Sequence, residues 1–335
     1  MLRHSSDDEP GYSRQKSGRG WAYFDEHGKR VTNRDEIERL NGVALPPAYT
    51  DAWFCKDPEG HLQATGRDAR GRKQYRYHPD FRKRQDKSKY ADCLAFGEAL
   101  PKLRARVEKD LRKRKLDRDT VLAAVVRLLD TEYIRIGNEE YARSNRSFGA
   151  TTLRTHHLRH QGGKLKMRFP AKHGIVREVT ITDRNLKRIV AKCHDLPGQM
   201  LFKYVNGSGE PQPVTSADVN DYIREGTGAD FTAKHFRTWA ASTIFYEQML
   251  EADEKRRLSL KSALEPVAEA LGNTPAISRK SYVHPALIDA LEDDPREPLN
   301  GAVLPRARRR LSRPETGFLS FLRTRTRRPR RKGDA

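Results

Sequence analysis

The chain has 335 residues, which is enough for about two domains. Its 66 Lys and Arg exceed its 45 Asp and Glu, and the resulting net charge of +21 favours a polyanionic partner, nucleic acid first. No run of about 18 apolar residues occurs, the start of the chain is polar, and the three cysteines lie far apart. We therefore expect a cytoplasmic protein without a membrane span, a secretory signal or a disulfide scaffold.

The motifs of metal and nucleotide chemistry are missing from the sequence. The cysteines form no CxxC pair, and the neighbouring His156 and His157 have no partners at zinc-ligand spacing. No GxxxxGK[ST] phosphate loop occurs. We expect neither a metal site nor a nucleotide cofactor.

The N-terminal part of the sequence predicts short strands. Residues 1–18 are predicted to be disordered, and residues 19–85 to form a small β-rich domain. Hairpin turns are expected between WAYFD and KRVT, and between AWFCKD and HLQATG at Pro58-Glu59-Gly60. In KQYRY, alternation places Tyr75 and Tyr77 on one face of a strand.

Residues 86–304 are predicted to form a mainly helical catalytic domain with a small antiparallel sheet, which makes the fold class α+β. An apolar helix, TVLAAVVRLLDTEYI, is expected to be capped by Asp119 or Thr120. The strands KLKMRF and IVREVTIT form a hairpin with Lys172 at its tip. Later helices are expected in residues 185–194, 216–225, 232–250 and 259–271, and a short helix opens at Thr274-Pro275 and ends near Tyr282.

The C-terminal segment, residues 305–335, has 12 Lys and Arg against two Asp and Glu. Its composition is low in complexity. We expect a flexible basic arm that strengthens non-specific binding to DNA.

A basic protein without metal or ATP motifs can break and rejoin a DNA strand if a covalent intermediate stores the phosphodiester energy. Tyrosine suits this task because its oxygen can attack and later leave. Arginine forks suit the negative charge of the transition state, and a Lys or His acid must protonate the departing 5′ oxygen. The chain offers a set of residues of these types, namely Arg135, Lys172, Arg237, Asn273 and Tyr282.

Taken alone, this set of residues is only suggestive. One arginine among 66 basic residues is more often a solvated charge, and one tyrosine among 12 is more often a packing residue. Asn273 also fits a turn after Gly272, and sequence spacing does not show that the five residues converge.

The motifs together resemble the type IB DNA topoisomerases of the small viral and bacterial, poxvirus-like kind, from about Trp21 to about Leu291. HLQATGRDARGRKQYRYHP and LPPAYTDAWFC are similar to the N-terminal part of that family. IRIGNEEYARSNRSFGATTL, the hairpin tip, KHFRTWAAS and LGNTPAISRKSYVHP are similar to its catalytic motifs. Any one of these motifs is weak evidence, whereas their combination is specific.

The resemblance implies an isomerase that clamps two domains around duplex DNA and relaxes its supercoils without ATP or metal. It implies that Tyr282 is the nucleophile, that Arg135 and Arg237 stabilise the transition state, and that Lys172 is the general acid. It further implies a monomer in the cytoplasm, associated with the nucleoid, that needs no protein partner and no membrane. The DNA-binding residues that it implies are Arg72, Lys73, Gln74, Tyr75, Tyr77 and Lys234.

The chain departs from the viral pattern at one catalytic position. Viral members have a histidine nine residues before the nucleophile, where this chain has Asn273. The amide can still donate a hydrogen bond to a non-bridging oxygen, but it carries no charge. The alternative interpretation is that Asn273 only makes a turn.

Two other functions remain as alternatives. Tyrosine recombinases share the chemistry, but their motif at the second arginine resembles HxxR, whereas this chain has Lys234 three residues before Arg237. A non-catalytic architectural DNA-binding protein would need only the basic surface. The interpretation that Tyr75 and Tyr77 pack under the small sheet likewise competes with DNA contact.

Overall fold

The computed structural model describes residues 2–69, 71–162, 164–252, 257–296, 298–299 and 305–327. The chain divides into two compact units, Met1–Lys89 and Tyr90–Ala335, and each has its own hydrophobic core. The boundary falls within helix α2 (Pro79–Leu111), a few residues beyond the predicted one. Among the described residues, no helix combines the length and the apolar character needed to cross a membrane.

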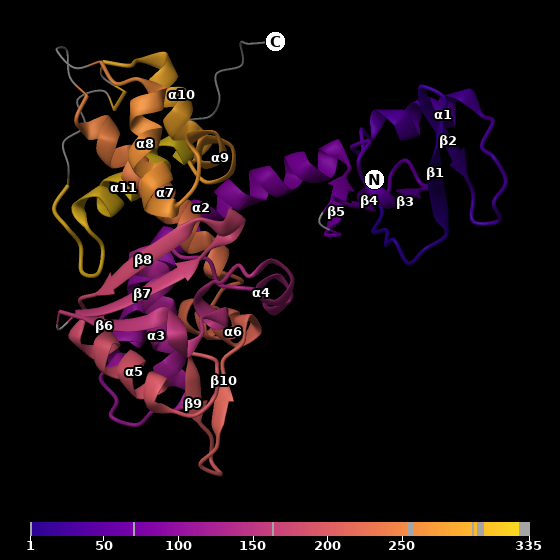
Figure 1. Ribbon diagram of the computed structural model, residues 1–335. Coiled ribbons are helices and arrows are strands. Elements are labelled where there is room, and N and C mark those ends of the chain that lie inside the picture. The colour runs from indigo at the N-terminus through magenta and orange to yellow at the C-terminus, as the bar shows by residue number, and fades with distance from the viewer. Residues whose placement is uncertain are drawn as a thin grey trace. The chain divides into compact units, whose positions relative to one another are not determined.

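The first unit is an antiparallel sheet with one short helix, α1 (Arg34–Gly42) (Figure 1). Asn33 caps this helix by accepting a hydrogen bond from the Glu36 amide, and Leu40 buries its apolar side against Tyr23 and Phe54. The strands, in spatial order, are β2 (Gly20–Phe24), β1 (Gly11–Ser17), β3 (Thr50–Cys55), β4 (Leu62–Arg67) and β5 (Lys73–Tyr77).

One sequence-based expectation for this unit is wrong, and one is confirmed. Residues 1–18 are not disordered, because β1 pairs with both β2 and β3, and the buried Ser5 hydroxyl donates to the Leu62 carbonyl oxygen. Hydrogen bonds to both neighbouring strands satisfy the backbone of β1. Its side chains show no apolar alternation, so the sequence does not reveal the strand. The turn predicted between WAYFD and KRVT is present: the Asp25 amide donates to the Lys29 carbonyl oxygen and the Val31 amide to the Tyr23 oxygen, around the antiparallel bridge between Phe24 and Arg30.

The second unit is mainly helical and also contains the antiparallel sheet β6-β7-β8 and a two-stranded ribbon, β9-β10 (Figure 1). Its strands are β6 (Leu158–Gln161), β7 (Lys164–Pro170), β8 (Val176–Ile181), β9 (Lys203–Val205) and β10 (Pro211–Pro213). Its helices after α2 are α3 (Arg118–Glu132), α4 (Glu139–Asn145), α5 (Arg184–Asp195), α6 (Ser216–Thr227), α7 (Ala233–Leu250), α8 (Leu260–Leu271), α9 (Pro275–Ser281), α10 (Pro285–Asp293) and α11 (Arg313–Arg327).

Helix α3 lies at the centre of this unit because it is apolar on nearly every side, and it packs against α5, α6 and α7. Its cap is Asp117, which accepts from the Thr120 amide, so the expected cap at Asp119 or Thr120 is wrong. Asp117 has the extended backbone that a cap requires, whereas the other two residues already lie in the helix. The helix ends at Tyr133, which adopts a left-handed conformation with φ of 53°.

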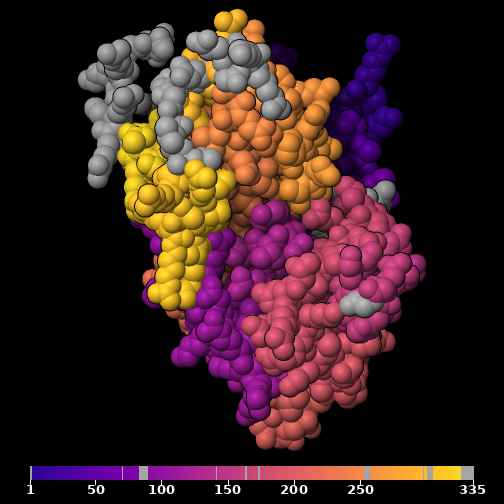
Figure 2. Space-filling model, turned by 90° about the vertical axis from the view of Figure 1, so that its left-hand side faces the viewer, coloured from indigo at the N-terminus to yellow at the C-terminus, as the bar shows by residue number. Residues whose placement is uncertain are grey.

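The C-terminal segment contains a packed helix rather than a flexible arm. Phe318, Leu319 and Leu322 of α11 are buried in the core of the second unit, against α7. Figure 2 shows α11, in yellow, seated on the rest of this unit. The prediction of a flexible arm is therefore wrong for residues 313–327, while residues 328–335 lie outside the described residues.

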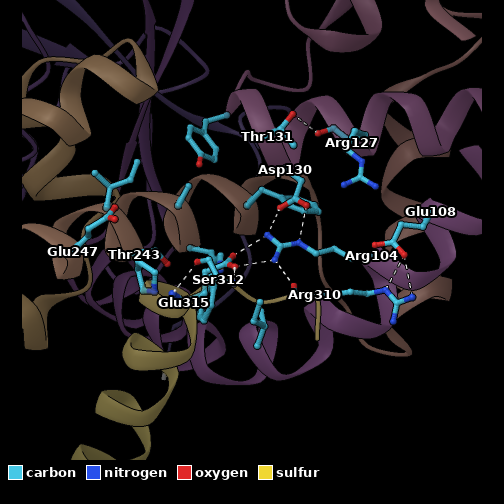
Figure 3. A pocket seen from close by; sticks show the side chains of 17 residues that line it. Arg104, Glu108, Arg127, Asp130, Thr131, Thr243, Glu247, Arg310, Ser312 and Glu315 are labelled. Carbon is cyan, nitrogen blue, oxygen red and sulfur yellow. Dashed lines mark hydrogen bonds and ion pairs between the residues drawn. The ribbon is translucent and has the colours of Figure 1, made fainter. Parts of the chain in front are cut away.

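Arg104 of α2 fastens this segment to α3. Its guanidinium donates to both carboxylate oxygens of Asp130, at 2.8 and 2.7 Å, and to both of Glu315, at 2.9 and 2.8 Å (Figure 3). Trp239 of α7 adds a hydrogen bond of 2.9 Å to Glu315. These side chains line a pocket of about 680 Å³ that contains none of the five predicted catalytic residues. Figure 3 shows Arg104 between the two carboxylates.

We predict that Glu315→Ala destabilises the second unit by about 3 kcal/mol, because it breaks a buried ion pair while Arg104 keeps Asp130. Burial alone would raise the pKa of Glu315, but Arg104 lowers it below its usual value. The contribution is therefore present above about pH 4.3 and is lost as the pH falls through the folded-state pKa. Urea unfolding at several pH values measures it. The matched control is the exposed Arg313→Ala, and an equal loss in both variants would contradict the prediction.

Candidate active site

Arg135 lies in the loop that leaves the central helix α3. Its carbonyl oxygen accepts from the Ala150 amide at 2.8 Å, and a Cβ at Gly149 would stand only 2.5 Å from that oxygen. The close approach requires glycine at residue 149 and fixes the path of the loop. The guanidinium of Arg135 donates to the Asn273 side-chain oxygen at 2.7 Å, across 138 residues of sequence.

Arg237 lies early in α7 and is almost completely buried, with 4% of its surface exposed. Its guanidinium donates to the carbonyl oxygens of Tyr133, at the end of α3, and Leu271, at the end of α8. Burial, followed by the charge of Arg135, lowers the pKa of Arg237 to about 10, so it remains protonated at neutral pH. The Nε of Arg237 has no partner among the described residues.

Asn273 follows the glycine that ends α8. Gly272 has φ of +60°, the left-handed conformation that such a helix end requires, and the Asn273 amide then donates to the Ala268 carbonyl oxygen. Because a guanidinium only donates, the Asn273 oxygen must face Arg135, and its NH₂ group points elsewhere. That NH₂ is buried and has no partner within the described part of the chain.

Tyr282 stands at the C-terminal end of α9, as predicted, and α9 begins at the predicted Thr274 cap with Pro275 in its first turn. The Arg237 guanidinium carbon lies 4.8 Å from the centre of the Tyr282 ring. Burial by itself would raise the pKa of Tyr282, but the charges of Arg237 and Arg135, and their hydrogen bonds to the phenol, lower it below the usual value. The phenol is therefore easier to deprotonate than an ordinary tyrosine.

Lys172, the fifth predicted catalytic residue, lies on the β7–β8 hairpin. It lies at the tip of the β7–β8 hairpin, as predicted, in a single 3₁₀ turn closed by the Gly174 amide on the Ala171 carbonyl oxygen. Its side chain is exposed. Within the described residues, Lys172 makes no hydrogen bond or ion pair with Arg135, Arg237, Asn273 or Tyr282.

The structure exposes the two tyrosines of β5 in the first unit. Tyr75 and Tyr77 are 47% and 36% exposed, and their rings stack at 6.2 Å. The interpretation that they pack under the sheet is therefore wrong. DNA contact by these residues stays a prediction.

The basic and polar residues named with these tyrosines have partners of their own. Asp68 accepts from both Arg72 and Gln74, and Lys73 forms an ion pair with Asp7. Lys234, in the second unit, is exposed at the start of α7. A phosphate would have to compete with Asp7 for Lys73, whereas Lys234 presents its charge to solvent.

Sequence analysis missed Arg177, on β8, although the pattern contained a signal. Strand alternation places Arg177 on the same face as the buried Val179 and Ile181, and a charged residue on an apolar face needs special partners. Its hydrogen bonds to the Glu132 and Ala270 carbonyl oxygens place Arg177 beside the segments of Arg135 and Asn273. Burial, together with the charge of Arg135, lowers the pKa of Arg177.

We predict that Arg135→Gln raises the pKa of Tyr282, because it removes one of the two charges that stabilise the phenolate. Spectrophotometric titration measures the phenolate, and the difference from Tyr282→Phe in the same background isolates this tyrosine from the others. The matched control is Arg168→Gln, an equal loss of charge at an exposed position on β7. An unchanged Tyr282 pKa in Arg135→Gln would contradict the electrostatic account.

Comparison with known proteins identifies the family of the chain. Residues 78–297 match the family model described as eukaryotic DNA topoisomerase I, catalytic core, and residues 20–68 match bacterial DNA topoisomerase IB, N-terminal domain. DNA topoisomerase 1B of Acanthamoeba polyphaga mimivirus is 31% identical over 85% of this chain and 88% of its own length. DNA topoisomerase 1B of vaccinia virus (strain Copenhagen) is 21% identical over 76% of this chain and 82% of its own length.

A structural search also found the XerH site-specific recombinase bound to difH substrate, at 16% identity and a TM-score of 0.34. That match covers 54% of this chain and 48% of the recombinase, and a likeness at this level supports no argument about function. The two family models and the mimivirus relative, in contrast, cover both units. The chain therefore belongs to the type IB DNA topoisomerases, which are isomerases that act on DNA.

Proposed function

We propose that this chain relaxes supercoiled duplex DNA by cutting one strand through a covalent tyrosine intermediate and then resealing it. The single observation that supports this chemistry most is the convergence of Tyr282, Arg237, Arg135 and Asn273 from separate segments of one unit. A nucleophile between two guanidinium groups suits attack on a phosphodiester.

The proposed cleavage step balances without a metal or a nucleotide. The Tyr282 oxygen loses its proton to water and forms a bond to the scissile phosphorus, while the bond from phosphorus to the 5′ oxygen breaks. The products are a 3′-phosphotyrosyl ester and a 5′ hydroxyl. The ester keeps the energy of the broken bond, so the 5′ hydroxyl can reverse the reaction after the nicked duplex has swivelled.

Arg135 and Arg237 are proposed to hold the non-bridging oxygens of the phosphate. Both are fixed before any DNA binds, Arg237 by two helix ends and Arg135 by Asn273. Donors that are already oriented stabilise developing charge without reorganising. The buried NH₂ of Asn273, which has no partner in the described chain, is the proposed third donor.

Lys172 is proposed to protonate the departing 5′ oxygen. An exposed lysine at a hairpin tip can reach a bound duplex, and an alkoxide leaving group requires a proton. Lys172 comes from a different element than the other four residues, and the 5′ oxygen departs on the side of phosphorus opposite the attacking tyrosine.

We also propose that the two units clamp the duplex, with Arg72, Lys73, Gln74, Tyr75 and Tyr77 of the first unit and Lys234 of the second touching DNA. The exposed Tyr75–Tyr77 pair offers flat contact area next to basic residues. Because one chain supplies every group of the chemistry, we propose that a monomer acts on nucleoid DNA in the cytoplasm.

We predict that Tyr282→Phe abolishes strand cleavage but binds DNA nearly as well as the parent, because it removes only one oxygen and keeps the ring under Arg237. Relaxation of a supercoiled plasmid in EDTA without ATP measures the activity, and a denaturing gel detects the covalent adduct. A covalent adduct in the Phe variant would identify a different nucleophile. Joining of two specific sites by the parent would favour a recombinase, and binding without relaxation an architectural protein.

We predict that Asn273→Ala slows single-turnover cleavage by about 10–10³-fold, since a donor to the transition state is lost. Asn273→Asp keeps the acceptor for Arg135 but has no donor, and should be at least as slow. Asn273→His should retain activity, because one ring nitrogen can accept from Arg135 while the other donates. If Ala and Asp both cleave at the parent's rate, Asn273 is only a turn residue.

A further inference from the structure

The side chain of Arg177 donates hydrogen bonds to three backbone carbonyl groups. Its Nη1 donates to the Glu269 carbonyl oxygen at 3.2 Å, and its Nη2 to the Ala270 oxygen at 3.0 Å and the Glu132 oxygen at 3.1 Å. The first two oxygens belong to the last turn of α8, and the third to the last residue of α3. Helix ends carry carbonyl groups without partners in the helix and a partial negative charge, which suits a buried cation.

These carbonyl groups lie next to residues of the proposed chemistry. Glu132 stands three residues before Arg135, and Ala270 three residues before Asn273. Arg177 itself lies on the hairpin whose tip carries Lys172. One guanidinium therefore joins the three segments that supply the proposed acid and two of the phosphate-binding groups.

Arg177 and Arg237 bind the same two helix ends at neighbouring positions. Arg237 takes the Tyr133 and Leu271 oxygens, each one residue beyond an oxygen that Arg177 takes. Arg237, however, comes from α7, which carries no part of the sheet. Of these two arginines, only Arg177 lies on the β7–β8 hairpin and connects it to the two helix ends.

Gly272 provides the space for this contact. A Cβ on Gly272 would lie 3.2 Å from the Cδ and the Nη1 of Arg177, so the arginine packs directly over the turn that leads to Asn273. The same residue needs its left-handed φ of +60°. Glycine is therefore needed both for the backbone conformation of the turn and for the space that the Arg177 side chain occupies.

The hairpin can transmit this anchoring to Lys172. Arg177 pairs with Phe169 in the ladder, the next pair is Pro170 with Val176, and the Ala171 amide then bonds to the Ile175 oxygen. A continuous ladder of paired residues therefore connects the anchor to the tip, although Pro170 has no amide hydrogen to donate and its carbonyl oxygen accepts from the Phe148 amide. Without the anchor, the tip is free to shift against the ends of α3 and α8, and a misplacement of about 1 Å can cost about 10²-fold in rate.

We propose that Arg177 is a positioning residue that fixes the β7–β8 hairpin against the ends of α3 and α8, and thereby sets Lys172 for proton transfer to the departing oxygen. This inference rests on the proposed function, in which Lys172 is the general acid. A purely structural role would lower stability without any preference for the acid step. A purely electrostatic role would weaken phosphate binding whatever the leaving group is.

A substrate with sulfur in place of the bridging 5′ oxygen separates these roles, because a thiolate leaves without a proton. Cleavage is measured in single turnover with saturating enzyme, on a duplex whose cleavage site has been mapped with the parent chain. We expect Arg177→Gln to cleave the oxygen substrate about 10–10²-fold more slowly than the parent, and the sulfur substrate within about twofold of it. Lys172→Ala is the reference for loss of the acid itself, and Arg168→Gln is the matched control for loss of an exposed charge on the same hairpin.

A double variant gives the second readout. If Arg177 acts through Lys172, Arg177→Gln adds no more than about twofold to the defect of Lys172→Ala. Equal slowing of Arg177→Gln on both substrates, a parental rate on oxygen, or full multiplication in the double variant would each overturn the inference. If Arg177→Gln does not melt cooperatively, Arg177→Lys replaces it and is judged on the same ratio of oxygen to sulfur rates.

Failure of the inference can be told apart from failure of the proposed function. A parent chain that does not cleave, a Tyr282→Phe variant that does, or a Lys172→Ala variant as fast as the parent on oxygen contradicts the proposed function. Cleavage that depends on Tyr282 and Lys172, together with an Arg177→Gln variant that behaves like Arg168→Gln, contradicts only the role of Arg177.

Discussion

The ends of helices α3 and α8 hold the candidate active site together, because their last carbonyl groups bind two arginines, the buried Arg237 and the half-buried Arg177. Arg237 exposes only 4% of its surface, and its charge would be costly to desolvate without the partners that it finds at Tyr133 and Leu271. The loop to Arg135 and the turn to Asn273 leave these same two helix ends. The site therefore depends on where two helices stop, and a left-handed residue ends each one, Tyr133 in one case and Gly272 in the other.

The arrangement concentrates positive charge before any phosphate binds. Arg135 lowers the pKa of both Arg177 and Arg237 after the larger effect of burial, so the arginines repel one another. The phenol of Tyr282 relieves part of this repulsion when it ionises, which is the physical origin of its lowered pKa. In the proposed reaction a phosphodiester brings negative charge to the same place, where the positive charges of the arginines attract it.

Local signals predicted much of the site. Gly272, the Thr274 cap and Pro275 are short-range features of helix ends, and they correctly located α9 and Tyr282 at its end. The hairpin around Lys172 was equally visible. The hydrogen bond between Arg135 and Asn273 was not, because the two residues are 138 positions apart and only tertiary packing joins them. Resemblance to a family implied that both residues act on one phosphate, but not that they bond to each other.

The errors of the sequence analysis also have physical causes. The many arginines of the C-terminal segment obscured its apolar stripe of Phe318, Leu319 and Leu322. The burial of this stripe makes α11 a packed helix. The side chains of β1 are mostly polar, and backbone groups make its ladder with β2 and β3. The sequence of β1 therefore shows no alternation of apolar and polar residues. Composition describes the solvent-facing side of an element well. The buried apolar side determined the structure of α11, and backbone hydrogen bonds determined that of β1.

The lowered pKa of Tyr282 acts on both directions of the proposed reaction. A more acidic phenol is also a better leaving group, so the guanidinium groups that assist attack likewise shorten the lifetime of the phosphotyrosyl ester. While that ester persists, rotation about the intact strand can relieve the torsional stress in the duplex. The number of turns released in one opening is the lifetime of the nick multiplied by the rate of rotation. The spacing between two arginines and one tyrosine ring would thus govern how coarsely the enzyme adjusts the linking number of its DNA.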